Sequence, residues 1–161
     1  VKRRPLDHSR RAHGKVDVDD AFVAFGKFRN GALLSLEATR FARGRKNQLS
    51  FEVNGSGGSL AFDLEQTNRL QFFSTADAIG RQGVRDILVT EPQHPYVKQW
   101  WPPGHLVGYE HTFVHTIADF VNAIVARKRV RPDFADGLAT QRVLDAIARS
   151  AKTKRCDLKI R

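Results

Sequence analysis

Residues 94–128 read HPYVKQWWPPGHLVGYEHTFVHTIADFVNAIVARK and join an aromatic loop to the longest helical pattern in the chain. Both tryptophans of the protein, Trp100 and Trp101, lie side by side in this loop. Two prolines follow them, and each proline fixes its own φ and keeps the preceding residue out of the helical region. The loop should therefore be stiff. Its aromatic residues Tyr96, Trp100 and Trp101 can be core residues or a lid over a cleft, and we favour one tryptophan anchoring the loop and the other lining a cleft.

A helix is predicted from about Gly108 or Tyr109, because apolar residues recur there with the helical period. One arc of this helix is apolar and should face a core: Tyr109, Phe113, Ile117, Phe120, Val121, Ile124 and Val125. The opposite arc carries a row at i, i+4 and i+8, namely His111, His115 and Asp119. Such a row can hold zinc, bind ligand hydroxyl groups or simply face solvent. We favour the solvated face and expect no metal site.

Short strand patterns alternate with tight turns upstream of this helix. Strands are predicted at residues 16–28, 32–41, 47–54, 59–64, 70–73 and 87–90. The first two are joined by Arg29-Asn30-Gly31, and Asn-Gly between two apolar runs is a strong hairpin signal. The glycine-rich turn at 55–58 is also predicted to be a hairpin turn. It is not expected to cradle a phosphate, because a strand and not a helix N-terminus follows it.

A second helix is predicted from Asp133 or Asp136 to Ser150, with either aspartate able to cap it. Its inward candidates are Leu138, Val143, Leu144 and Ile147. The order of the elements, strands first and helices after, predicts an α+β fold. We expect an open-faced, mostly antiparallel sheet of about six strands, with two C-terminal helices packed on one face. Residues 1–15 should form an irregular basic lead-in and residues 16–161 the domain itself.

Composition limits the class of protein. The chain has 161 residues, of which 41% are hydrophobic, and this suits one soluble domain with a core. No apolar run reaches the roughly 18–20 residues of a membrane span, so no membrane is expected. Cys156 is the single cysteine, which excludes an internal disulfide and slightly favours a reducing, cytoplasmic compartment. The absence of methionine suggests a piece of a longer protein or a processed form.

The net charge of +10 raises the question of nucleic-acid binding. The basic residues are, however, spread over four separate groups, and no zinc spacing, RNP-like strand or recognition-helix motif accompanies them. We therefore expect a solvated basic surface and no nucleic-acid partner.

The first predicted hairpin is apolar on both of its faces. Phe22, Ala24 and Phe28 alternate with Ala21, Val23 and Phe25. A half-solvated antiparallel sheet should instead alternate apolar with polar residues. A large exposed apolar patch usually marks an interface, so a homo-oligomer, either a dimer or a tetramer, is expected through the sheet face.

Three segments carry a resemblance to a known family: residues 16–40, 51–65 and 108–153. They resemble the C-terminal domain of the Gfo/Idh/MocA oxidoreductases, the family of glucose–fructose oxidoreductase and inositol dehydrogenase. Residues 37–47 and 94–105 look most like the levoglucosan dehydrogenase branch of sugar dehydrogenases. Arg40, Arg45 and Asn47 match the pattern of that branch, but no role is assigned to them.

The resemblance implies an enzyme of two domains. An upstream Rossmann domain, absent from this chain, would bind NAD or NADP, and the present domain would close a sugar or polyol site and form subunit contacts. The family's catalytic motifs do not occur here, so no catalytic or cofactor-binding residue is carried over, and this chain alone should be inactive. The candidate substrate-binding residues are Trp100, Trp101, His105, Tyr109 and His111. The alternative is a non-catalytic, truncated remnant that only binds or oligomerises.

Overall fold

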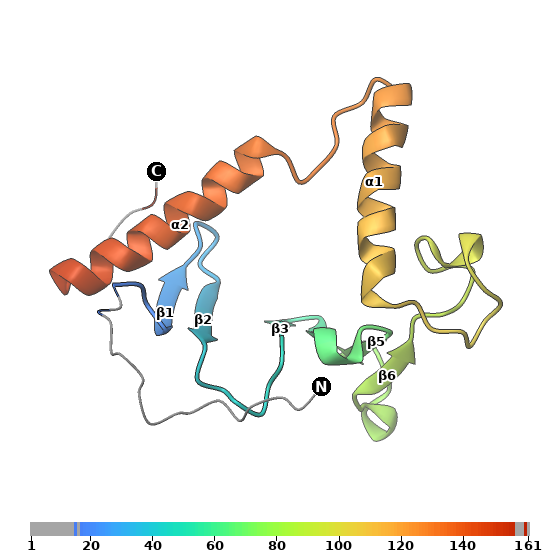
Figure 1. The fold of residues 1–161 in the computed structure, drawn as a ribbon. Helices are drawn as coiled ribbons and strands as arrows, with labels where there is room; N and C mark the ends of the chain where they lie inside the picture. Colours follow the sequence, from blue (N-terminus) through green and yellow to red (C-terminus); the bar gives the residue numbers. More distant parts are fainter. Residues whose placement is uncertain (1–14, 16, 157–159, 161) are drawn as a thin grey trace, which may run out of the picture. The chain divides into compact units, whose positions relative to one another are not determined.

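The computed structural model describes residues 15, 17–156 and 160, so residues 1–14 of the predicted lead-in lie outside the described part. The chain divides into two compact units, residues 1–44 and 45–161. Figure 1 shows the order of the elements, in which six strands precede two α-helices. All strand pairs are antiparallel, which confirms the α+β class. Of the helices that the structure describes, none combines the length and apolar character that a membrane span requires.

The first unit contains a β-hairpin, formed by β1 (Ala21–Lys27) and β2 (Leu33–Thr39). Its turn is the predicted Asn-Gly turn. The N–H of Gly31 donates to the carbonyl oxygen of Phe28 at 3.0 Å. Gly31 has a φ of 93°, a value that glycine adopts without strain. The local sequence therefore predicted this turn correctly.

The two faces of the hairpin differ in exposure. One face is half-buried and carries Phe22, Ala24, Leu34 and Leu36. On the other face Val23 is 63% exposed, and Phe25 and Leu33 are each 82% exposed. The prediction that both faces are apolar is therefore confirmed, and one of them is left open to solvent.

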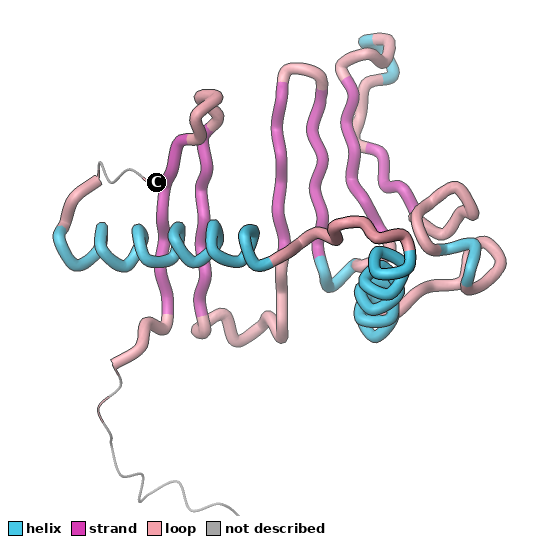
Figure 2. Tube along the Cα trace, turned by 90° about the horizontal axis from the view of Figure 1, so that it is seen from above, coloured by secondary structure: helices cyan, strands magenta, loops and turns pink. Residues whose placement is uncertain are grey.

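The second unit contains a four-stranded sheet in the order β3-β4-β5-β6, seen as neighbouring strands in Figure 2. Its strands are β3 (Ser50–Gly55), β4 (Gly58–Asp63), β5 (Arg69–Ser74) and β6 (Arg85–Leu88). A short 3-10 helix, η2 (Leu64–Gln66), links β4 to β5. The six predicted strands are all present, but their hydrogen bonds divide them into a pair and a set of four instead of one continuous sheet.

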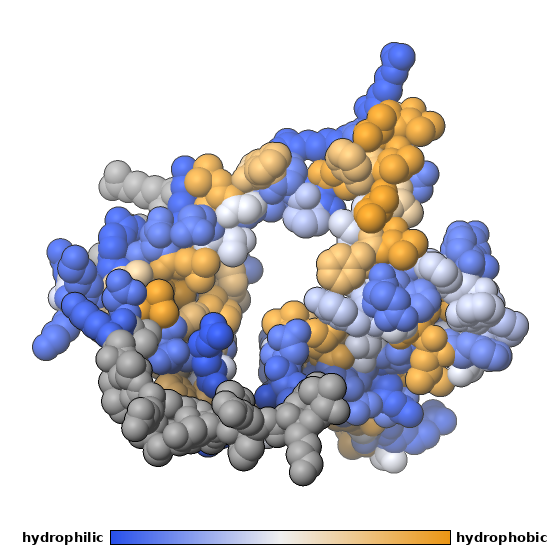
Figure 3. Space-filling model, in the orientation of Figure 1, coloured by the Kyte–Doolittle hydropathy of each residue, from blue (hydrophilic) through white to orange (hydrophobic). Residues whose placement is uncertain are grey.

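Helix α1 (Tyr109–Val125) begins where the sequence pattern predicts it. Its apolar arc is exposed: Phe113, Ile117 and Ile124 are 57%, 64% and 61% exposed. Figure 3 shows this apolar surface along α1. The expectation of a buried arc is therefore not met within residues 45–161, because the other described residues of this unit do not cover it.

Helix α2 (Phe134–Thr153) follows a linker and contains one buried residue, Ala146. Among its predicted inward residues, Val143 and Ile147 are half-buried. Leu138 and Leu144 are instead 52% and 44% exposed, so the prediction is only half right.

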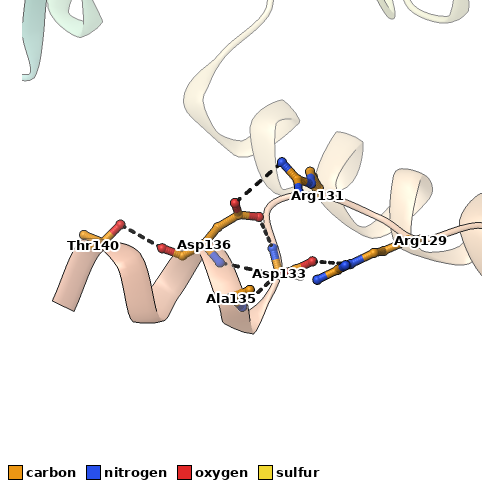
Figure 4. Close-up of polar contacts among 6 residues, drawn as sticks. All are labelled: Arg129, Arg131, Asp133, Ala135, Asp136 and Thr140. Carbon is orange, nitrogen blue, oxygen red and sulfur yellow. Dashed lines mark hydrogen bonds and ion pairs between the residues drawn. The ribbon is translucent and has the colours of Figure 1, made fainter. Parts of the chain in front are cut away.

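The N-terminus of α2 is capped by Asp133, as predicted (Figure 4). Its carboxylate accepts hydrogen bonds from the backbone N–H groups of Ala135 at 2.7 Å and of Asp136 at 3.3 Å. The Asp136 carboxylate in turn accepts from the N–H of Asp133 at 2.9 Å, which completes a reciprocal capping box. Arg129 donates to Asp133 at 2.5 Å. The hydrogen bond from Arg129, together with those from the two backbone N–H groups, lowers the pKa of the Asp133 carboxyl.

Replacing Asp133 with alanine is expected to lower the melting temperature by about 2–4 °C at pH 7, because a helix loses its cap. Since the folded-state pKa is lowered, the stabilisation is present above the unfolded pKa of about 4 and is lost as the pH falls through the folded pKa. Thermal melts of both forms at pH 7 and at pH 2 check this. An equal difference at both pH values would contradict the role of the ionised carboxylate.

Candidate functional site

A long loop connects β6 to α1 and contains the most buried side chains of the second unit outside α2. Thr90 is 2% exposed and Val97 is 7% exposed. The hydroxyl of Thr90 accepts a hydrogen bond from the N–H of Gly104 at 3.2 Å, which ties the start of the loop to its proline-rich end. Val97 begins a short 3-10 helix, η4 (Val97–Gln99). The loop is therefore an anchored structure, in agreement with the stiffness that its sequence predicts.

Asn68, in the connection between β4 and β5, holds the far end of this loop. Its side-chain amide donates to the carbonyl oxygen of Val107 at 2.8 Å, and its side-chain oxygen accepts from the N–H of Val107 at 3.0 Å. This two-way contact pairs one amide side chain with one backbone residue next to the start of α1. The sheet thus sets the position of the N-terminus of α1.

The row of polar residues on α1 contacts the loop. The ring N–H of Trp100 donates to Nε2 of His115 at 2.7 Å. The hydroxyl of Tyr96 donates to the carboxylate of Asp119 at 2.6 Å, and the Tyr96 ring stacks on His115 with 4.2 Å between centroids. The hydrogen bond to Asp119, followed by burial, raises the pKa of Tyr96. The favoured prediction of a solvated face was therefore wrong for this row.

His111 is the first residue of the row and also contacts the loop. Its Nδ1 accepts from the N–H of Gly108 at 3.0 Å, and its ring meets the Trp100 ring edge-on at 4.4 Å. The hydrogen bonds to Nδ1 of His111 and to Nε2 of His115 are those of neutral imidazole rings in which these nitrogens are the acceptors. No group of three or more His, Cys, Asp or Glu residues with the arrangement of a metal site occurs among the residues that the structure describes.

The candidate residues from the sequence divide into two groups. Trp100 and His111 lie against each other and are partly buried. Trp101 and Tyr109 are 55% and 54% exposed, and His105 is exposed with its Nδ1 2.9 Å from the carbonyl oxygen of Pro102. One tryptophan therefore anchors the loop, as predicted, while the other is exposed to solvent.

Nothing in the sequence indicated Asn68 as a contributor to this site, or the hydrogen bond between Tyr96 and Asp119. The i+4 spacing of the row indicated that Asp119 shares a face with the two histidines, but nothing indicated the partner of that face. Asn68 and Val107 are 39 residues apart in the chain, and no local pattern links them.

Residues 2–160 match the model of an oxidoreductase family, described as its C-terminal alpha/beta domain. Levoglucosan dehydrogenase from Pseudarthrobacter phenanthrenivorans is 42% identical over 139 residues, which are 86% of this chain and 35% of that protein.

Two solved structures are similar to most of this chain. The oxidoreductase domain protein from Kribbella flavida has 54% identity and a TM-score of 0.86, over 88% of this chain and 38% of its own. Levoglucosan dehydrogenase in complex with NADH and levoglucosan has 41% identity and a TM-score of 0.83, over 88% of this chain and 38% of its own. The chain thus spans little more than a third of the length of these relatives.

Proposed function

The chain belongs to the Gfo/Idh/MocA oxidoreductase family, as its C-terminal alpha/beta domain, and from this premise we propose that it is the substrate-binding and oligomerisation domain of a longer NAD(P)-dependent enzyme. The enzyme oxidises a secondary hydroxyl group of a cyclic sugar or polyol. The observation that carries this proposal is the likeness to levoglucosan dehydrogenase, one solved structure of which contains NADH and levoglucosan.

The loop between β6 and α1 provides the sugar-binding surface in this proposal. Trp100 is held against His111 and His115, so the loop is in place before a ligand arrives and little entropy is lost on binding. Trp101 and His105 then offer an aromatic face and an imidazole to the ligand. Aromatic rings combine a broad apolar surface with polar edges, which suits the mixed surface of a sugar.

Two exposed apolar surfaces, the arc of α1 and one face of the hairpin, are covered by other parts of the enzyme in this proposal. A Rossmann domain in another segment of the longer protein binds NAD or NADP, and the exposed apolar arc of α1 is a surface against which such a segment can pack. The exposed hairpin face around Phe25 and Leu33 forms the contact between subunits of a dimer or tetramer. Cofactor chemistry belongs to the nicotinamide, while this domain binds and orients the sugar.

In the intact enzyme, Trp101→Ala and His105→Ala are each expected to raise the KM for the sugar about tenfold or more. Each removes a contact to the substrate and leaves the dinucleotide site untouched. Steady-state kinetics with varied sugar and with varied NAD or NADP measure both constants. Residues 1–161 without the rest of the enzyme are expected to form no NADH from any sugar.

Gln93→Ala, an exposed polar change in the same loop, is a matched control and should leave both constants unchanged. Equal increases in the KM for the sugar and for the cofactor in the Trp101 and His105 variants would contradict the proposal that this loop binds the sugar and not the cofactor. An intact protein that oxidises no sugar or polyol with NAD or NADP would overturn the function itself.

A further inference from the structure

We propose that the depression beside the N-terminus of α1 is a second sugar-binding surface, in which Lys46, Asn47 and the Tyr109 hydroxyl bind substrate hydroxyl groups. The depression has a volume of about 230 Å³ and is lined by Lys46, Asn47, Leu64, Glu65, Thr67 and Tyr109. Drug-sized ligands occupy pockets of about 300–1,000 Å³, so this smaller space suits a molecule of monosaccharide size. The inference rests on the proposed function, since it names a part of the substrate site.

The structure fixes the walls of this depression. Glu65 accepts from the guanidinium of Arg45 at 2.8 Å and lies 3.5 Å from the backbone N–H of Lys46, so it holds residues 45 and 46 against η2. Tyr109 is the first residue of α1, directly after the segment that Asn68 clamps through Val107. Both sides of the depression are therefore in place without a ligand, which reduces the cost of binding.

The groups that could meet a ligand are unused. In the part of the chain that the structure describes, no hydrogen bond or ion pair engages the side chains of Lys46 and Asn47 or the hydroxyl of Tyr109. The Tyr109 ring is 54% exposed and contacts Phe113 edge-on, with 5.3 Å between centroids. Three of the residues that line the depression thus carry side-chain polar groups that no other described residue engages.

The chemistry of the lining suits the hydroxyl groups of a polyol. A sugar hydroxyl both donates and accepts hydrogen bonds, and the depression contains a donor residue, Lys46, and an acceptor residue, Glu65. Because Arg45 pairs with Glu65, the ammonium of Lys46 is the unpaired charge among these three side chains, and it can donate a charge-assisted hydrogen bond to a hydroxyl group.

The test uses the intact enzyme with Lys46→Met, Asn47→Ala and Tyr109→Phe, and a set of monodeoxy analogues of its best sugar. Lys46→Met is expected to raise the KM for the sugar about tenfold or more, as for the loss of a charge-assisted hydrogen bond, with smaller increases for the other two variants. The KM for NAD or NADP should change less than twofold. For one deoxy analogue, the wild-type enzyme and Lys46→Met should have the same KM, because the hydroxyl that the lysine binds is absent.

Lys128→Met removes a lysine of the exposed turn after α1 and should leave every constant at the wild-type value. Lys46→Gln keeps a donor of similar length and has to recover part of the loss, which a general folding defect would not allow. An unchanged sugar KM in Lys46→Met, a larger change for the cofactor, or an equal loss with every deoxy analogue would overturn the inference while the proposed function stands. A wild-type enzyme without activity on any sugar would remove the proposed function, and this inference with it.

Discussion

Replacing Gly58 with alanine is expected to disrupt the four-stranded sheet and, with it, the support of the site. Gly58 is the first residue of β4 and has a φ of 151°, which side chains rarely adopt. A Cβ atom at this position would lie 2.1 Å from the carbonyl oxygen of Phe73 on β5. The overlap is with backbone, so no side-chain rotation relieves it, and β4 and β5 have to move apart. The free energy of unfolding should fall by about 3 kcal/mol or more, which lowers the melting temperature by about 6–12 °C.

Gly57→Ala is the matched control, because it changes the neighbouring residue of the same turn. A Cβ atom there meets nothing within 4 Å, and the backbone does not require glycine. Thermal melts followed by circular dichroism should show Gly57→Ala close to wild type and Gly58→Ala strongly destabilised. Similar melting temperatures for the two variants would show that the approach of β4 to β5 is not the constraint.

Introducing aspartate at Phe25 is expected to separate the subunits of the oligomer that we propose. Phe25 is 82% exposed beside Val23 and Leu33 on the open face of the hairpin, so a charge there costs nothing while that face is solvated. In a subunit interface the same charge would be buried without a partner. The dissociation constant of the oligomer should therefore rise about 100-fold or more. Light scattering at moderate salt should give an oligomer for the wild-type protein and a folded monomer for Phe25→Asp.

Two further variants distinguish loss of the interface from a loss of stability and from a change in net charge. Phe22→Asp places the charge on the half-buried face of the same strand and should reduce stability instead of releasing a folded monomer. Gln93→Asp adds one negative charge at an exposed loop position and should leave the oligomer intact, although it changes the net charge by the same amount as Phe25→Asp. A wild-type protein that is monomeric at high concentration would refute assembly through this face.

The sequence alone predicted the features that depend on neighbouring residues. The Asn30-Gly31 turn follows from local backbone preferences, and the cap at Asp133 follows from an aspartate placed before a helical period. The start of α1 and the assignment of all six strands also follow from periodicity. The different exposure of Trp100 and Trp101 was also predictable, because two adjacent side chains in a non-helical loop do not readily both point inward.

Only the tertiary structure decided which side of α1 meets the loop between β6 and α1. Periodicity separates the apolar arc from the row of His111, His115 and Asp119, but it does not name the partner of either side. That row meets Tyr96 and Trp100, which are 23 and 15 residues away from Asp119 and His115. The contact of Asn68 with Val107 and the free groups around Lys46 arise in the same way, from segments that are distant in the sequence. Local preferences act over a few residues, whereas the site is built from hydrogen bonds between segments that only the folded chain brings together.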